Sequence, residues 1–476
     1  MLFSDLFFLF FFMPLCCILY YIAKDIKQKN SVLIIFSLFF YVFGEPIKVL
    51  FLLLSVGINY IVGLLIADDK ARGKSGKGFL IIGLLFDIGM LGVFKYTDFL
   101  IDNINGIFGT SIAHSGIVMP LGISFFTFQI LSYIIDVYWD KVPVQKKFHK
   151  LLLYITMFPQ LVAGPIVRYE TVAAEIDNRT VTLDDLCDGM TRFVTGLAKK
   201  VLIANTLNLA VNEFFGTSED ALLGASNTVV GCWMGAICYA LLIYFDFSGY
   251  SDMAIGMGRM FGFHFDENFD HPFASKSISE FWQRWHISLG SFFRDYLLYL
   301  PIFGKRRQYM SIFLVWFTTG LWHGASWNFV IWGLYFGIFV FTESKIGKKK
   351  LKKVPAVAMH IYTALVLIIG FGIFYFTDMQ SLGLFLKGLV GASGQPFISD
   401  ATTTTLTKYL YVILFALITS MPILPAIKNR IKKCNSKVKG IAQLASCLAS
   451  VVMLVMVYAV LVDSFATNNV FIYFRF

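Results

Sequence analysis

Long apolar segments recur along the whole chain, and they constrain its fold more than any other feature. A bilayer core about 30 Å thick is crossed by a helix of about 20 apolar residues. Because 57% of the residues are hydrophobic and the mean hydropathy is +0.70, a water-facing surface could not accommodate these side chains. We therefore predict an all-α polytopic membrane protein with about 11–12 transmembrane helices. The expected spans are residues 4–23, 31–46, 48–67, 79–97, 119–138, 196–215, 229–246, 308–322, 325–343, 357–376, 408–425 and 441–463.

The apolar segments leave no room for a separate soluble domain, so we predict a single integral membrane domain over residues 1–476. The formal net charge of +10 comes from Lys and Arg in short runs between apolar segments. That pattern is typical of topology signals and does not favour a nucleic-acid partner. The seven cysteines have neither metal-ligand spacing nor a disulfide framework, and we predict no metal and no bound cofactor.

The basic runs also predict an orientation, because positively charged loops stay in the cytoplasm. With these loops inside, the loops left outside are poor in Lys and Arg, and both termini fall outside. Met1–Tyr21 lacks a basic start and a small-residue cleavage site, so we expect a first spanning helix rather than a removed signal peptide. The predicted cytoplasmic stretches are residues 24–29, 70–77, 141–150, 305–307, 345–353 and 428–439.

Two regions do not fit simple crossings. Residues 150–195 contain Pro159, Gly164 and Pro165 within an apolar run, and residues 247–304 combine aromatic side chains with charge and glycine. Irregular backbone at membrane depth is tolerated only beside protein or a water-filled cavity. We therefore predict re-entrant or interfacial helices in both regions, surrounding a central tunnel.

The second of these regions holds most of the candidate site residues. Ionisable groups this numerous near lipid must pair with each other or line a polar cavity. The alternative interpretation is an ion-pair network that only holds re-entrant helices, and it remains open for Asp252, Arg284 and Arg294. A purely structural role also remains open for His286. The candidates are Asp246, Asp252, Glu280, Arg284, His286, Arg294 and Asp295.

A second candidate is His323, which lies between two apolar segments whose outer ends both meet basic loops. From residue 308 a helix rises about 22 Å before reaching His323, which is past the middle of a ~30 Å core. A neutral imidazole there, beside Trp322 and Trp327, suits proton transfer in a narrow channel. The alternative is a buried histidine that only packs between helices.

The order of these motifs resembles the membrane-bound O-acyltransferase family, in particular its bacterial branch, which acylates cell-envelope polysaccharides. The resemblance covers most of residues 1–345, with 119–345 as the catalytic core. One departure follows Tyr296, where residues 300–307 replace the glycine-rich loop that alginate-type members carry. The matching segments are Leu121–Gln129, Phe158–Arg168, Gly196–Lys200, Asp246–Gly258, Phe281–Tyr296 and Gly320–Gly333.

The resemblance implies acyl transfer, with His323 as the essential base and His286 as the second histidine of the family. It also implies acetyl-CoA, or an acyl carrier thioester, as a cytoplasmic donor in a bacterial cytoplasmic membrane. The acceptor would be an extracytoplasmic polysaccharide, reached directly or through a secreted SGNH-type transferase. The residues expected to bind substrate are Trp282, Trp285, Trp322, Asp295, Arg294 and Asp246.

The last six residues, Phe471–Phe476, resemble the tail of a small partner protein in the D-alanylation system. That resemblance makes Tyr473, in an extracytoplasmic tail of residues 464–476, a candidate acyl carrier. A phenol with a pKa near 10 leaves more readily than a sugar hydroxyl, so an acyl-tyrosine would retain transfer potential. The alternative is an aromatic belt at the membrane interface.

Two other functions stay open. Within the family, the chain could transfer D-alanine from a carrier protein to teichoic acid. Outside it, a polysaccharide flippase or channel could also use about twelve spans and a charged interior. The flippase interpretation predicts that replacing His323 weakens output without abolishing it.

Overall fold

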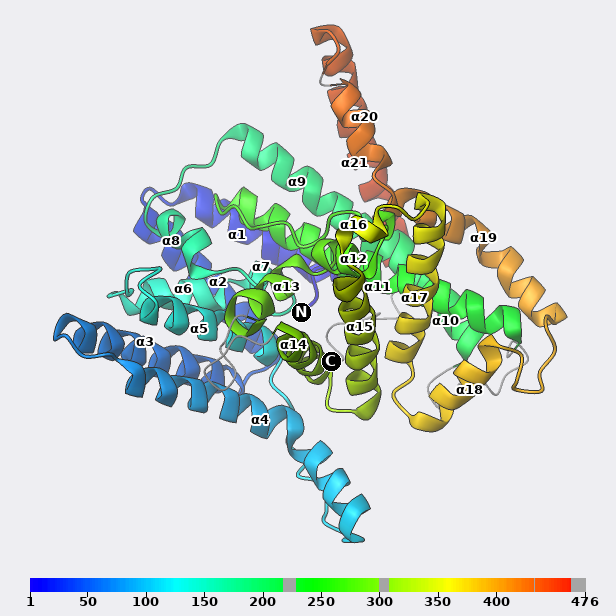
Figure 1. The fold of residues 1–476 in the computed structure, drawn as a ribbon. Coiled ribbons are helices and arrows are strands. Elements are labelled where there is room, and N and C mark those ends of the chain that lie inside the picture. The colour runs from blue at the N-terminus through cyan, green and yellow to red at the C-terminus, as the bar shows by residue number, and fades with distance from the viewer. Residues whose placement is uncertain (217–227, 299–307, 432, 464–476) are drawn as a thin grey trace. The chain divides into compact units, whose positions relative to one another are not determined.

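The computed structural model describes residues 1–216, 228–298, 308–431 and 433–463 (Figure 1). In these ranges every regular element is a helix, and the sole β-type pairing is an isolated bridge between Phe269 and Trp285. The described chain forms two compact units: residues 1–193 with 250–267, and residues 194–249 with 268–463. Tyr473 and the departure at 300–307 lie outside the described residues, and the single-domain assignment stays a prediction.

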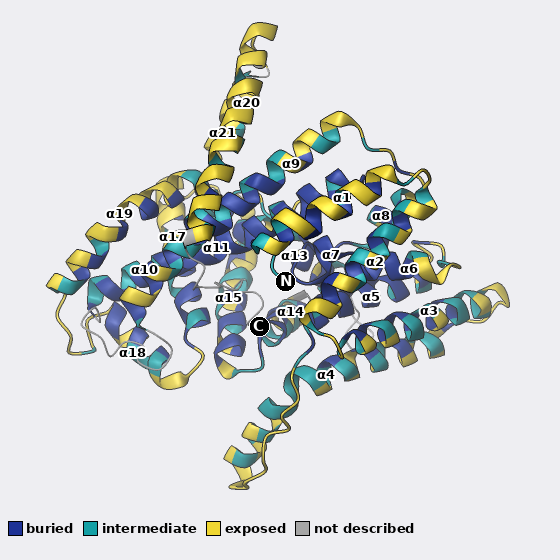
Figure 2. Ribbon diagram, turned by 180° about the vertical axis from the view of Figure 1, so that it is seen from behind, coloured by how far each residue is buried: buried dark blue, intermediate teal, exposed yellow. Residues whose placement is uncertain are grey.

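The first unit is built around α5, which is buried on almost every side (Figure 2). A left-handed Gly122 starts α5 after Pro120, and α3 and α4 run alongside it. Its polar side chains, such as Gln129 and Asp136, are therefore inside protein rather than in lipid. The elements are η1 (Phe8–Phe12), α1 (Met13–Ile22), α2 (Ile26–Gly44), α3 (Val49–Ala71), α4 (Lys77–Phe108), α5 (Ile123–Tyr138), α6 (Phe148–Thr156), α7 (Phe158–Leu161) and α8 (Tyr169–Asp177).

Helices α9 (Leu183–Ala198) and α11 (Val229–Met260) contribute residues to both units. The second unit contains the remaining helices, in which α14 and α15 form a close hairpin and α15 packs against α17. They are η2 (Lys199–Ala204), α10 (Asn205–Phe215), η3 (Pro272–Ala274), α12 (Ile278–Arg284), α13 (Ile287–Phe293), η4 (Arg294–Leu298), α14 (Gln308–His323), α15 (Trp327–Ile346), α16 (Lys348–Leu351), α17 (Ala356–Tyr375), α18 (Met379–Leu389), α19 (Asp400–Ser420), α20 (Ile423–Ile431) and α21 (Ser436–Asp463).

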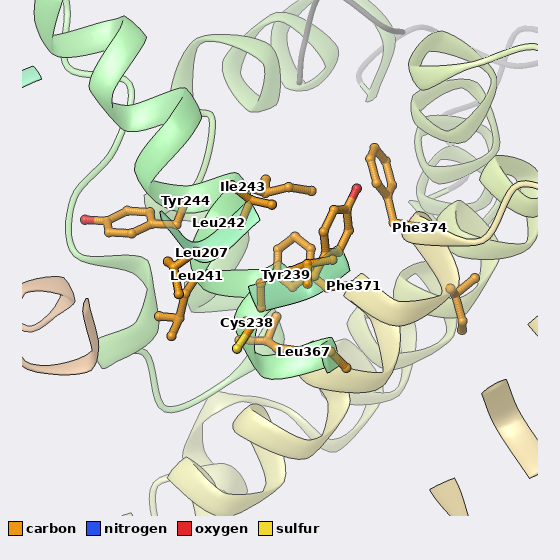
Figure 3. Packing of buried hydrophobic residues seen from close by; sticks show 14 of the residues in the cluster. Leu207, Cys238, Tyr239, Leu241, Leu242, Ile243, Tyr244, Leu367, Phe371 and Phe374 are labelled. Atoms are coloured by element: carbon orange, nitrogen blue, oxygen red, sulfur yellow. The ribbon is translucent and has the colours of Figure 1, made fainter. Parts of the chain in front are cut away.

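The core of the second unit forms where α11 and α17 meet (Figure 3). Consecutive α11 residues from Cys238 to Tyr244 are all buried, so this part of the helix has no lipid-facing side. On α17, Leu367, Phe371 and Phe374 face the same core. By contrast, α21 exposes most of its apolar side chains, as expected for a helix that faces lipid.

Eight helices of the described chain are long and apolar enough to cross a membrane. Each corresponds to one of the spans expected from the sequence, which confirms an all-α multi-pass membrane protein. They are Ile26–Gly44, Val49–Ala71, Lys77–Phe108, Val229–Met260, Trp327–Ile346, Ala356–Tyr375, Asp400–Ser420 and Ser436–Val462.

The other four expected spans have different forms. Phe8–Ile22 and α5 are apolar but shorter than 18 residues, and α14 has 16 residues because it ends at His323. The expected span 196–215 is divided among the end of α9, the π-helical η2 and α10. The number of spans that satisfy both length and composition is therefore smaller than the predicted 11–12.

Helices, mainly short ones, make up most of the described part of the two irregular regions, and their re-entrant or interfacial placement stays a prediction. After Met157, which follows the end of α6, α7 begins at Phe158 with Pro159 in its first turn, and the chain from Leu151 to Val167 is buried throughout. The boundary at residue 247 was wrong, because α11 continues to Met260 as one helix. Its polar residues Ser248 and Ser251 are buried within the protein, so hydropathy alone ended the helix too early.

Candidate active site

A cavity of about 1000 Å³ lies entirely within the second unit and is lined by both candidate histidines. His286 comes from the link between α12 and α13, and His323 comes from the end of α14. Both side chains are nearly fully buried. Ile312 of α14 also lines the cavity. The cavity therefore extends about 16 Å along α14 from His323, at ~1.5 Å of helix rise per residue.

His286 is fixed by its backbone as well as by its ring. Its φ of +45° places it in the left-handed region, which non-glycine residues seldom adopt. The neighbouring Trp285 pairs with Phe269, and the backbone N–H of Ile287 donates to the carbonyl oxygen of Asn268 at 2.9 Å. The chain therefore reverses tightly at His286 and directs the ring into the protein.

Asn268 also determines which nitrogen of His286 carries the proton. Its Oδ1 accepts from the backbone N–H of Ser288 at 3.2 Å, which identifies that atom as the amide oxygen. The same Oδ1 lies 3.1 Å from Nδ1 of His286. Since an amide oxygen can only accept, a neutral His286 places its hydrogen on Nδ1 and its lone pair on Nε2. The ring can thus act as a base or an acceptor through Nε2.

His323 lies in an aromatic environment. Its ring centroid is 5.0 Å from that of Trp322, 4.9 Å from that of Trp332 and 5.2 Å from that of Phe374, each in an edge-on arrangement. The aromatic rings thus enclose the imidazole, and a general base in this position accepts a proton through a neutral ring nitrogen.

Two glycines bring α14 and α15 close enough for this environment to form. A Cβ on Gly320 would lie 2.4 Å from the carbonyl oxygen of Phe329, and a Cβ on Gly333 would lie 2.3 Å from that of Trp316. Any larger residue would separate the two helices. The Gly320–Gly333 motif of the sequence is therefore a close helix contact that places Trp332 against His323.

The remaining predicted site residues divide into two groups. Trp282, Trp285 and Arg294 line the cavity. Trp322, Asp295 and Asp246 are not among its lining residues. Trp322 contacts both histidines, Asp295 accepts from Nε of Arg294 at 2.8 Å, and Asp246 is buried 2.5 Å from the ammonium group of Lys200.

Two further charged candidates, Arg284 and Asp252, also form ion pairs. Arg284 contacts Glu280 at 2.8 Å, and Asp252 contacts Arg192 at 2.9 Å. Neither Arg284 nor Asp252 lines the cavity. The pair of Asp252 and Arg192 links α11 to α9, whereas Arg284 and Glu280 both belong to α12.

Several lining residues were missed by the sequence reasoning. Trp316 resembles an ordinary member of an apolar segment, and Lys348 and Lys352 resemble topology signals. Glu343 could have been recognised as a candidate from the sequence, because it is a lone acidic residue at the end of an apolar run. Its buried carboxylate faces the start of α12.

The fold and the site together define an integral membrane enzyme in which two imidazoles lie at the buried end of a long cavity. The chain belongs to the membrane-bound O-acyltransferase family, whose model matches residues 140–385. It is therefore an acyltransferase, as the order of its motifs predicted.

The similarity to individual family members extends beyond the matched segment. A protein of Pseudomonas aeruginosa named probable alginate O-acetylase is 39% identical, over 80% of this chain and 73% of the relative. The peptidoglycan O-acetyltransferase of Helicobacter pylori is 32% identical, over 83% and 80%. The teichoic acid D-alanyltransferase of Bacillus subtilis is 31% identical, over 50% and 62%.

Proposed function

We propose that this protein takes an acetyl group from acetyl-CoA on the cytoplasmic side of a bacterial cytoplasmic membrane and transfers it toward an extracytoplasmic polysaccharide. The observation that most directly supports the proposal is that two buried histidines and exposed lysines line the same cavity. The two O-acetyl-transferring relatives, aligned over most of the chain, support acetyl as the group transferred.

In the proposed reaction, the acceptor hydroxyl attacks the carbonyl carbon of the thioester. His323 takes the hydroxyl proton as the new C–O bond forms. The C–S bond then breaks, and the thiolate leaves as the free thiol after taking up a proton. Trp282 and Trp285 enclose the donor arm, and His286 offers Nε2 on the same cavity wall.

The lysines on the cavity wall fit the donor. Lys276, Lys348 and Lys352 are exposed residues that line it, and Lys348 begins α16 in a run predicted to be cytoplasmic. Cations suit the phosphates of coenzyme A, while the cavity along α14 suits an extended pantetheine arm. Lys348→Glu should raise the KM for acetyl-CoA, whereas Lys349→Glu, on the same short helix but outside the lining set, should not.

The nature of the acceptor and the transfer of the acyl group to the extracytoplasmic side are inferred from the sequence. Tyr473 is proposed as a transient acyl carrier, which would pass the group to a polysaccharide directly or through a secreted SGNH-type transferase. Both termini are proposed to lie outside, from the distribution of basic runs. D-alanyl transfer from a carrier protein is the second candidate, supported by the 31% identity to a teichoic acid D-alanyltransferase.

The test is intact-mass analysis of purified protein after incubation with acetyl-CoA, with peptide mapping of the tail. Wild type should gain an acetyl group on Tyr473, and His323→Ala and Tyr473→Phe should not. His149→Ala, an exposed histidine outside the cavity, is the matched control. If polymer acetylation in cells survives His323→Ala, His323 is not the base and the proposed mechanism is wrong. If labelling requires a D-alanyl carrier protein, the second candidate replaces the first.

A further inference from the structure

The start of α12 is held by a carboxylate that comes from a distant helix. Glu343, near the end of α15, is 4% exposed. Its Oε1 accepts from the backbone N–H of Ile278 at 2.8 Å, and its Oε2 accepts from that of Ser279 at 2.8 Å. The hydroxyl of Tyr362 on α17 donates to Oε1 at 3.2 Å. One side chain therefore connects α12, α15 and α17.

These contacts complete the capping of α12. The first backbone N–H groups of a helix have no partner within it. The side chain of Ser277 accepts from the N–H of Glu280 at 3.1 Å, so Glu343 supplies partners for the two N–H groups that Ser277 does not reach. Ser277, which adjoins the helix in sequence, thus accepts from one backbone N–H group, and the distant Glu343 accepts from the other two.

A carboxylate suits this position. The two N–H groups bond separate oxygens of Glu343, whereas a glutamine of the same size would offer one acceptor oxygen and one donor nitrogen. Its amide nitrogen would face a backbone N–H, leaving a buried donor unpaired. The two backbone N–H groups of α12 therefore explain why a glutamate occupies position 343.

Helix α12 carries the side chains that form one wall of the cavity. The ring centroid of Trp282 lies 5.1 Å from that of Trp316 and 4.9 Å from that of Phe336. Directly after α12 come Trp285 and His286, which line the same cavity. A shift at the start of this seven-residue helix would move all three side chains.

We propose that Glu343 is a positioning residue for acyl transfer, which anchors α12 so that Trp282 and His286 are aligned with the donor. Its role in transfer rests on the proposed function, but the anchor itself does not. Because catalysis depends steeply on geometry, loosening the anchor should lower kcat per folded molecule by a larger factor than it raises the KM for the donor.

Hydrogen exchange and transfer kinetics on the full-length protein test the proposal together. Glu343→Gln should accelerate amide exchange in peptides that span residues 276–286 and lower kcat about tenfold, with a monodisperse elution profile like that of wild type. Glu213→Gln is the matched control, since that carboxylate bonds Lys408 and Tyr409 away from the cavity and should change neither quantity. Tyr362→Phe removes only the phenol contact and should give a smaller change in the same direction.

The outcomes separate the two proposals. Unchanged exchange in Glu343→Gln would overturn the anchor, and faster exchange with wild-type kcat would overturn its role in transfer. Should Glu343→Gln not fold, Tyr362→Phe decides by the same two measurements. If wild type transfers nothing from acetyl-CoA, the proposed function fails, while the exchange result still decides whether Glu343 holds α12.

Discussion

His286 and His323 contact the same indole, that of Trp322, whose ring centroid lies 6.0 Å from the first imidazole and 5.0 Å from the second. The two histidines come from different helical segments and line one cavity. Their shared neighbour limits how far either ring can move. The site therefore presents two imidazoles in a fixed arrangement, as a proton-transfer site requires.

Replacing His286 should lower activity far more than stability. Asn tolerates the left-handed backbone that His286 adopts, so His286→Asn keeps the turn and removes the titratable ring. If His286 takes part in proton transfer, we expect a loss of about a hundredfold in kcat. Steady-state kinetics in detergent, with thermal unfolding recorded in parallel, measures both quantities.

His271→Asn is the matched control for this prediction. His271 has the same φ of +45° and is half-buried in the same unit, but it does not line the cavity. It should retain nearly full activity. Equal losses in both variants would mean that the turn, and not the imidazole of His286, is what matters.

The contact between α14 and α15 should not tolerate even one added methyl group. Gly320→Ala places a Cβ against the carbonyl oxygen of Phe329, and overpacking of this kind costs about 1–3 kcal/mol. We expect a lower unfolding temperature and reduced transfer, because His323 is three residues further along α14. Gly89→Ala, where a Cβ meets open space, should be as stable as wild type or slightly more stable. An unchanged unfolding temperature for Gly320→Ala would contradict the close contact.

The start of α9 should loosen in acid. Asp185 and Thr182 cap this helix reciprocally, and the hydrogen bond from Thr182 is the main cause that lowers the pKa of Asp185 to about 2. A depressed folded-state pKa stabilises the helix start above the unfolded pKa of about 3.9, and this stability is lost as pH falls through 2.

Hydrogen exchange of the α9 start measures this effect between pH 5 and pH 2.5, after correction for intrinsic rates. Protection should fall over that interval in wild type and change less in Asp185→Asn, which cannot ionise. A parallel loss of protection in both proteins would assign the acid effect to other carboxylates.

The predicted orientation can be checked with a native cysteine. Cys434 is exposed and lies in a basic stretch expected to be cytoplasmic. A membrane-impermeant thiol reagent should therefore label it only after the cells are permeabilised. Ser111→Cys, in an exposed loop expected outside, should be labelled in intact cells. Labelling of Cys434 in intact cells would reverse the proposed topology.

The sequence by itself determined the membrane class, the helical fold and the positions of the eight long spans. These follow from local properties, because about 20 apolar residues must form a helix in lipid and basic runs separate one helix from the next. It also identified His286 and His323, through a resemblance whose family the comparisons confirm. Their catalytic roles stay proposals.

Only the tertiary structure decided which side chains share the cavity. A hydropathy pattern takes no account of neighbouring protein, so the span predicted from it ended before Ser248 and Ser251. In the structure α11 continues through both residues, and their side chains are buried against protein. The hydropathy pattern also could not show that Asp246 pairs with Lys200 or that Glu343 holds the start of α12. These contacts join residues far apart in the chain, and helix packing, which no local pattern encodes, determines where they meet.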